Sequence, residues 1–325
     1  MKIRTSENRL RIDAGKTQPV ILLCIMLLMV VVQNVLVPGS LSISQLFIVS
    51  RQASTLGIVA LGQAMVILMG GTDLSVGSMV MITNVFCIAV MGGSNDNLAL
   101  GIAMCVGMGL LVGIVNAVGV LVLRIAPFVM TLCTMTILQG ISYVYTQGAP
   151  TGSAAPTIRT LGTGKVFDLI PYSTIIWLSL ALVMWVVLRY TGFGRKLYAV
   201  GGNRKAARQS GVHSDMMVAF SYIFSSLMAT LAGIILSGYM NITSLTLGGD
   251  YVMNSLAAVL IGGNAIEGGK GGVWPVVLGA MFIQLLMAVL TMLGITEVGK
   301  LIAQGVIIFA VVAMHGVMQG KKQRG

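Results

Sequence analysis

The residue types that most often perform chemistry are few in this chain, and they are not arranged for catalysis. Its 325 residues include four cysteines, two histidines and nine acidic residues. All four cysteines lie inside apolar runs, without Cys-x-x-Cys spacing or a nearby histidine, and we interpret them as small buried hydrophobic residues. The sequence has no Ser/His/Asp set and no carboxylates paired on one face. It therefore predicts neither an enzyme nor a metal site.

One segment has the spacing of a phosphate-binding loop. Residues 294–301 contain Gly294, Gly299 and Lys300 at the positions that this motif requires. However, Leu301 replaces the hydroxyl residue that would hold Mg²⁺, and the segment joins two apolar runs rather than a strand and a helix. We interpret the spacing as a coincidence, so the chain is expected to bind no ATP and no other cofactor.

The elements that must position these residues are membrane helices. Hydrophobic residues make up 56% of the chain and charged residues only 9%, against roughly 25% charged residues in soluble domains. This composition excludes an ordinary soluble enzyme, and it also excludes a disordered chain, which needs low hydrophobicity. Aromatic residues, at 6%, are too few for an outer-membrane barrel. The predicted fold class is an all-α polytopic membrane protein.

Apolar runs of about 20 residues are long enough to cross the hydrocarbon core of a bilayer. We predict about ten such spans, at residues 19–37, 43–69, 74–91, 98–123, 127–145, 171–190, 216–238, 251–266, 273–293 and 298–317. The first is expected to be an uncleaved span, because no small-residue cleavage site follows it. This gives an N-terminal tail over residues 1–18, a transmembrane domain over 19–317 and a C-terminal tail over 318–325.

The positive charges predict the orientation of these spans. Most of the 20 lysines and arginines fall in the two tails and in the loops that share a side with them. Because Lys and Arg accumulate in cytoplasmic loops, both termini are predicted to be cytoplasmic, with loop 191–215 inside and loop 147–170 outside. The net charge of +11 is interpreted as a topology signal rather than as a sign of nucleic-acid binding.

The long inner loop carries a helix signature. Asn203 is a favoured N-cap, the next seven residues favour helix, and Gly211 suits the left-handed position after the last turn. Arg204, Lys205 and Arg208 could dock onto an acidic groove of a partner, with a small flat contact supplied by Ala206, Ala207 and Val212. The alternative is a solvated, positively charged loop.

Asp73 is the acidic residue that we consider for ion coupling, directly after Gly70, Gly71 and Thr72 where a helix restarts. Its carboxylate could cap that helix, pair with a basic group at an inner gate, or relay a proton. The last role would make the chain an ion-coupled secondary transporter of a small polar solute. If Asp73 only caps the helix, a separate protein must supply the energy for transport.

Three stretches carry a resemblance to a known family. They are residues 51–78, which include Gly70-Gly-Thr-Asp73-Leu-Ser75-Val-Gly77, residues 127–140, and residues 192–212; a fourth, 257–271, fits loosely. These stretches resemble the permease subunit of bacterial ABC importers of the ribose/xylose/galactose type. The chain departs from the family pattern at Tyr251-Val-Met-Asn254-Ser-Leu-Ala257, where the family has two acidic residues. The departure could mark an unusual substrate or one of two unlike permeases.

The resemblance implies the ABC importer permease fold in the bacterial inner membrane. It also implies a second permease subunit, identical or different, a cytoplasmic ATPase docked on the inner loop, and a periplasmic binding protein that delivers a monosaccharide. The outer loop 147–170, with Arg159 and Lys165, could be the landing place of that protein or an ordered crossover between halves. The implied ATPase-coupling residues are Arg195, Asn203, Arg204, Lys205, Ala206, Ala207, Arg208, Gly211 and Val212.

Polar side chains inside spans are costly in lipid and should face the bundle interior. The predicted path residues are Arg51, Asp73, Asn84, Asn116, Thr131, Gln139, Tyr143, Asn241 and Asn254, with Thr134 and Gln284 as further candidates. Hydrogen bonding between helices is the competing role for each of them. Gly109 and Gly113 have the four-residue spacing that lets two helices approach closely.

Overall fold

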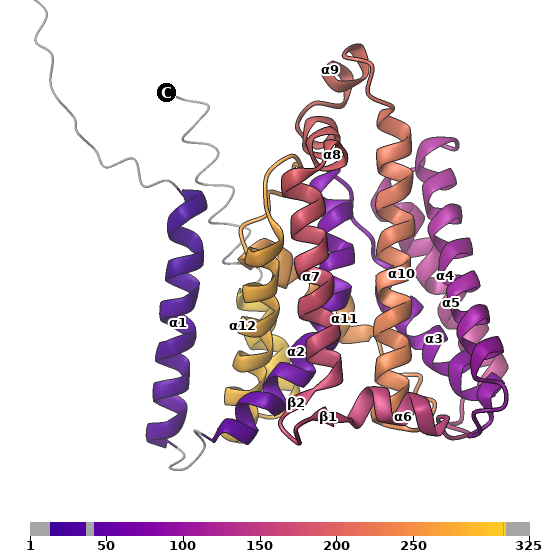
Figure 1. Ribbon diagram of the computed structural model, residues 1–325, viewed down its shortest axis with the longest axis vertical. Helices are drawn as coiled ribbons and strands as arrows, with labels where there is room; N and C mark the ends of the chain where they lie inside the picture. The colour runs from indigo at the N-terminus through magenta and orange to yellow at the C-terminus, as the bar shows by residue number, and fades with distance from the viewer. Residues whose placement is uncertain (1–13, 37–41, 308, 310–325) are drawn as a thin grey trace, which may run out of the picture.

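The computed structural model of the protein describes residues 14–36, 42–307 and 309. This part of the chain is almost entirely helical, with one small antiparallel hairpin (Figure 1). The elements are α1 (Ala14–Leu36), α2 (Ile43–Leu68), α3 (Ser75–Met91), α4 (Leu98–Leu121), α5 (Pro127–Thr146), α6 (Pro156–Thr163), β1 (Lys165–Val166), β2 (Ile170–Pro171), α7 (Tyr172–Tyr190), α8 (Gly192–Gly202), α9 (Arg204–Gln209), α10 (Ser214–Met240), α11 (Gly249–Ile261) and α12 (Val273–Met292). Residues 297–307 are also helical.

The long helices stand side by side in a bundle around α2 (Figure 1). In α2, 89% of the most apolar stretch is buried, and the helix contacts α7, α10, α11 and α12. The corresponding shares in α4 and α5 are only 28% and 22%, so these two helices expose apolar side chains on the outside of the bundle. Apolar residues on an outer face suit contact with lipid, whereas a helix that is apolar all round belongs in the centre.

The length and composition of the helices confirm an all-α polytopic membrane protein. Six helices of the described region, α2, α4, α5, α7, α10 and α12, are long and apolar enough to cross a membrane. Three shorter helices of this region are also apolar: residues 20–35, which lie within α1, and the helices α3 and α11. The count of ten spans therefore stays a prediction, and the last predicted span lies partly outside the described residues.

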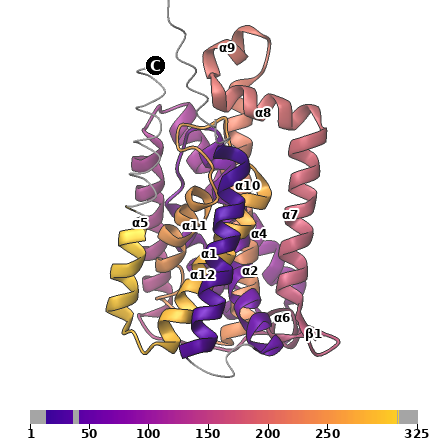
Figure 2. The same ribbon diagram turned by 90° about the vertical axis from the view of Figure 1, so that its left-hand side faces the viewer.

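The two ends of the bundle differ. Figure 2 shows α8 and α9 at one end, where α8 runs across the top of α7, and α6 with the hairpin at the other end. The predicted outer loop 147–170 therefore contains a short helix and a two-residue strand pairing, Lys165 with Pro171 and Val166 with Ile170. The sequence did not predict α6, α8 or the hairpin.

Helix α11 begins inside the bundle, because the chain before it re-enters. The Asn84 side chain of α3 donates to the carbonyl of Ile242 (3.3 Å) and accepts from the backbone N–H of Ser244 (2.8 Å). Two turns earlier on α3, Gly77 touches the backbone of Gly248 so closely that neither position has room for a side-chain carbon. Residues 242–248 therefore run beside α3 for about 10 Å. This explains why α11 has only 13 residues.

Close approach of α4 and α10 depends on two glycines, as their spacing predicted. A side-chain carbon at Gly109 would meet the Thr230 side chain, and one at Gly113 would meet the backbone of Ile223. Gly107, on the same helix, has nothing within 4 Å of that position. Substitutions at these three glycines can therefore separate the effect of helix packing on stability from the effect of helix propensity.

We expect Gly113→Leu to lower the free energy of unfolding by about 1–3 kcal/mol, because the α10 backbone must move away. Gly107→Leu should leave stability unchanged or slightly higher, since leucine favours helix. Thermal unfolding of the two purified variants checks this. If both variants unfold at the same temperature as the wild type, the α4–α10 contact is not as close as described.

Candidate functional site

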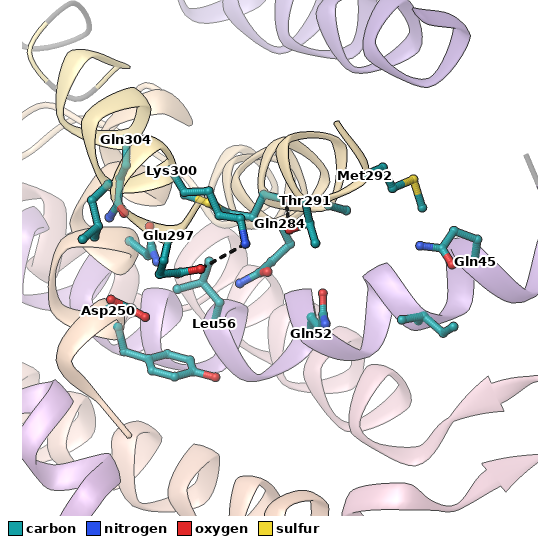
Figure 3. A pocket seen from close by; sticks show the side chains of 16 residues that line it. Gln45, Gln52, Leu56, Asp250, Gln284, Thr291, Met292, Glu297, Lys300 and Gln304 are labelled. Carbon is teal, nitrogen blue, oxygen red and sulfur yellow. Dashed lines mark hydrogen bonds and ion pairs between the residues drawn. The ribbon is translucent and has the colours of Figure 1, made fainter. Parts of the chain in front are cut away.

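A cavity of about 360 Å³ lies among α2, α11, α12 and the helical residues 297–307. It lies toward the end of the bundle that carries α6 and the hairpin, since its residues come from the first turns of α2 and α11 and the last turns of α12. Its polar lining consists of Gln45, Gln52, Asp250, Asn254, Gln284, Thr291, Glu297, Lys300 and Gln304. In Figure 3, Gln52, Gln284 and Lys300 converge on this space from three different helices.

Helix geometry brings these amides together. Gln45 and Gln52 are seven residues apart on α2, so they lie on the same face two turns from each other. Asn254 is one turn into α11, whose first turn, with Asp250 and Tyr251, also lines the cavity. The first N–H groups of a helix lack intrahelical partners and favour polar or negatively charged neighbours. The cavity therefore combines amide side chains with a helix N-terminus.

Asn254 is the most distinctive of the lining residues. The residue is 7% exposed, and its Oδ1 atom accepts no hydrogen bond within the described structure. A buried acceptor without a partner costs about 1–3 kcal/mol. This cost falls on a residue whose side chain lines the cavity.

The charges in the cavity nearly balance. Lys300 Nζ lies 3.0 Å from Glu297 Oε2, and the lysine side chain is only 17% exposed. Together with Asp250, the lining holds two carboxylates and one ammonium group among several amides. This arrangement suits a small uncharged solute with many hydroxyl groups.

The segment with phosphate-loop spacing, residues 294–301, forms a turn at Gly294, where φ is +71°, and then the start of a helix.

Asp73 lies away from this cavity in a buried hydrogen-bond network. Its carboxylate accepts from the backbone N–H (3.0 Å) and hydroxyl (2.6 Å) of Ser75 and from the hydroxyl of Ser225 (2.8 Å). Ser225 lies about three turns along α10, so Asp73 is deep in the bundle. Within the described residues Asp73 forms no ion pair. Asp73 thus accepts from one of the free N–H groups at the start of α3, although Leu74 and not Asp73 occupies the N-cap position.

Two other predicted path residues belong to the same network. Asn116 of α4 donates to the Ser75 hydroxyl (2.9 Å) and accepts from Thr134 of α5 (2.7 Å). The Thr131 hydroxyl accepts from the backbone N–H of Leu74 (3.1 Å). Asn116 and Thr131 therefore hold the start of α3 against α4 and α5, and neither lines the cavity.

Three more of the predicted path residues hold the ends of helices near α6. Asn84 also donates to the Ser237 hydroxyl of α10 (3.1 Å). Asn241 accepts from the backbone N–H of Ala154 (3.2 Å). Arg51 donates to the carbonyl of Thr163 (3.3 Å), and its guanidinium lies 5.9 Å from the centre of the Tyr239 ring. The contacts of Asn241 and Arg51 thus fix the predicted outer loop on α10 and α2, whereas Asn84 joins α3 to α10 and to the segment that follows it.

The remaining predicted path residues lie on α5. Tyr143 is 51% exposed and Gln139 is partly exposed, both outside the cavity lining. Of the nine predicted path residues, only Asn254 therefore lines the cavity; Gln284, a further candidate, does as well. Sequence reasoning missed Gln45, Gln52 and Gln304, whose only signal is an amide within or beside an apolar run.

At the opposite end of the bundle, α8 and α9 form the segment predicted to contact a partner. The Asn203 side chain caps α9 by accepting from the backbone N–H of Ala206 (3.0 Å), and Gly211 has a φ of +81°. Both features confirm the sequence prediction, although α9 has six residues rather than seven. Thr191 caps α8, a helix that was not predicted from the sequence. The buried residues of α8, at 194, 197 and 200, recur every three positions.

The segment is attached firmly to the bundle. Ala207, Val200 and Met217 form a buried cluster against which Val212 also packs. Ala207 is thus turned toward the chain itself, which corrects its assignment to an exposed docking surface, whereas Lys205 and Ala206 are exposed. Gly201 of α8 has no room for a side-chain carbon, because the carbonyl of Leu68 at the end of α2 lies against it.

Asp215 at the start of α10 holds α9 in place. Arg204 lies 2.8 Å and Arg208 3.5 Å from its two carboxylate oxygens. The hydrogen bond from Arg204, with the charges of both arginines, holds the pKa of Asp215 below its ordinary value. The stabilisation is therefore fully present above about pH 4, near the pKa of an unfolded aspartate, and is lost as the pH falls through the folded pKa.

We expect Asp215→Asn to loosen α9 at neutral pH. Because the pair is exposed, the effect should be modest, up to about a fivefold rise in amide exchange over residues 203–212. Wild-type protein should show the same rise only below about pH 4. Hydrogen–deuterium exchange measures both, with Asp168→Asn at the other end as control. Equal exchange in the two variants would show that the ion pairs do not hold α9.

Comparison with known proteins adds an independent line of evidence. Residues 45–311 match the protein family described as the branched-chain amino acid transport system / permease component. The chain is 33% identical over 301 residues to the ribose import permease protein RbsC of Haemophilus influenzae, covering 91% of this chain and 93% of the relative.

Two further relatives extend the comparison. RbsC of Bacillus subtilis is 30% identical over 323 residues, covering 96% of this chain and 97% of the relative. The galactofuranose transporter permease protein YtfT of Escherichia coli is 32% identical over 286 residues, covering 86% and 83%. No solved structure matches the chain.

Proposed function

The chain belongs to the permease family of bacterial ABC sugar importers, and on this premise we propose that it forms the membrane passage for a monosaccharide. The observation that carries the proposal is the polar cavity among α2, α11, α12 and residues 297–307. Amide side chains, which are uncharged, exchange hydrogen bonds with sugar hydroxyls, and the three ionisable groups of the lining leave a net charge of only −1. The relatives named for ribose and galactofuranose import support a sugar as the solute.

A separate ATPase is proposed to drive the cycle by binding α8 and α9. Within the chain, α8 touches the end of α2 at Gly201, and Gly269 donates a backbone hydrogen bond to Leu68 (2.9 Å). Gly269 lies in the connection between α11 and α12. A displacement of α8 would therefore reach three of the elements that line the cavity. This contiguity supports coupling between the two ends of the bundle.

The rest of the assembly follows from the same premise. We place the chain in the bacterial inner membrane with both tails in the cytoplasm, residues 19–317 as the transmembrane domain, and α8–α9 on the cytoplasmic side. A periplasmic sugar-binding protein would meet the α6 end, and a second permease subunit, identical or different, would complete the passage. The chain itself would hold no ATP, metal or other cofactor.

Uptake into reconstituted vesicles tests the function. Vesicles that contain this chain with its ATPase and binding protein should accumulate labelled sugar only when ATP is supplied on the α8–α9 side. Vesicles without the ATPase should show no uptake, with or without an ion gradient. Uptake driven by an ion gradient through the chain alone would contradict the proposal and support the ion-coupled alternative.

A further inference from the structure

A second cavity, of about 650 Å³, lies between α9 and the turn that joins α4 to α5. Four basic residues line it, Arg124, Arg204, Lys205 and Arg208, against one acidic residue, Asp215. Asp215 is shared by Arg204 and Arg208. The other two basic groups, Arg124 and Lys205, form no ion pair within the described structure. The cavity thus has a positive charge that the chain does not neutralise.

The rest of the lining is apolar. Val120 and Leu121 at the end of α4, with Ile125 and Pro127 at the start of α5, complete the wall. Such a wall suits the first methylene groups of lipid acyl chains better than it suits the charged surface of a soluble protein.

Exposed apolar side chains adjoin the lining residues of this cavity in the sequence. Val122 is 70%, Leu123 65%, Phe128 56% and Met216 67% exposed. Side chains of this kind belong in the bilayer, so the cavity lies where hydrocarbon gives way to the headgroups. Basic side chains at that depth meet lipid phosphates, and basic pockets between helices on the cytoplasmic side bind anionic headgroups.

We propose that this cavity binds the headgroup of an anionic phospholipid, with Arg124 and Lys205 on its phosphate and Val120 and Leu121 on the first methylene groups of its acyl chains. The guanidinium of Arg124 can hold two phosphate oxygens at once. The bound lipid would bridge the α4–α5 turn and the Lys205 side of α9, and α8 with the rest of α9 would remain for the ATPase of the proposed function. The inference rests on the proposed function only in that the α8–α9 end lies at the cytoplasmic membrane surface.

The test measures lipid binding to the purified full chain, so its result does not depend on transport. The protein is delipidated in neutral detergent, titrated with phosphatidylglycerol or phosphatidylcholine, and the retained lipid is counted by native mass spectrometry. We expect selective retention of phosphatidylglycerol. Arg124→Ser with Lys205→Ser should weaken it about 30-fold, the fold-change that corresponds to about 1 kcal/mol for each basic residue.

A matched control removes the same charge elsewhere on the same end. Arg195 and Lys196 are exposed on α8 and do not line the cavity. Arg195→Ser with Lys196→Ser should retain phosphatidylglycerol within about twofold of the wild type. Lys205→Ser alone, at an exposed position that does not endanger folding, should lower affinity about fivefold.

Three results would overturn the inference. One is equal loss in both double variants, which would mean that bulk charge alone attracts the lipid. Another is displacement of the retained phosphatidylglycerol by inorganic phosphate, which would assign the cavity to a soluble anion. The third is stoichiometric displacement of the lipid by the ATPase, which would assign it to an acidic protein surface. If vesicles show no sugar uptake but the purified chain still binds phosphatidylglycerol selectively, the proposed function is rejected and the lipid site is unaffected.

Discussion

Asn254→Leu combined with Gln284→Met should reduce sugar uptake at sub-saturating concentration by about 10- to 30-fold. Each substitution keeps the size of the side chain and removes its amide, so the cavity loses two groups that could bond a sugar hydroxyl. Two lost hydrogen bonds at about 1 kcal/mol each account for this reduction. The measurement is initial uptake into vesicles that contain the complete importer.

The same variant should be at least as stable as the wild type. Asn254 Oδ1 is buried without a partner, so its removal relieves a cost of about 1–3 kcal/mol. Gln139→Leu is the control, because Gln139 was a predicted path residue that the structure places outside the cavity. It should leave uptake unchanged. Normal uptake by the Asn254/Gln284 variant, or loss of uptake with Gln139→Leu, would contradict the placement of the passage.

Asn203→Pro combined with Arg208→Glu should abolish ATP-driven uptake while the chain remains inserted. Asn203 has a φ of −157°, which proline cannot adopt, and its backbone N–H donates to the carbonyl of Ala199 (3.0 Å), a bond that proline removes. Glutamate at position 208 would face Asp215 and replace attraction by repulsion. The α9 surface would therefore lose its shape, and the ATPase its contact.

A conservative pair of substitutions at the same positions separates the loss of the α9 surface from other effects of substitution. Asn203→Asp with Arg208→Lys keeps an N-cap acceptor and the positive charge, so it should retain most of the uptake. Uptake and permease-stimulated ATP hydrolysis are measured together in both variants. Wild-type uptake by the proline and glutamate variant would remove α9 from the coupling mechanism.

The sequence predicted the helices better than their contacts. Apolar runs located the long helices, and local chemistry placed the Asn203 cap, the left-handed Gly211 and the close packing at Gly113. All of these depend on residues near one another in sequence or on a helical spacing. The count of ten membrane spans depends on more than that and remains a prediction.

The cavity could not be predicted because it depends on which way α2 faces. That helix is apolar on nearly all sides, so its periodicity gives no direction to Gln45 and Gln52. The start of α11 depends on the contact between Gly77 and Gly248, and the Asp73 network depends on Ser225, both distant in sequence. Most of the polar residues in spans do lie inside the bundle, but Tyr143 is exposed, and most of the others bond helices together.

Cysteine labelling across the transport cycle tests the central claim, that the polar cavity is a gated passage. Of the four cysteines interpreted from the sequence as buried, only Cys87 and Cys105 are; Cys24 and Cys133 are exposed and are first replaced by serine. In the reconstituted importer, Gln284→Cys should react with a membrane-impermeant reagent from the α6 side in one nucleotide state and from the α8–α9 side in another. Reaction from one side only in every nucleotide state, or no reaction at all, would contradict the account.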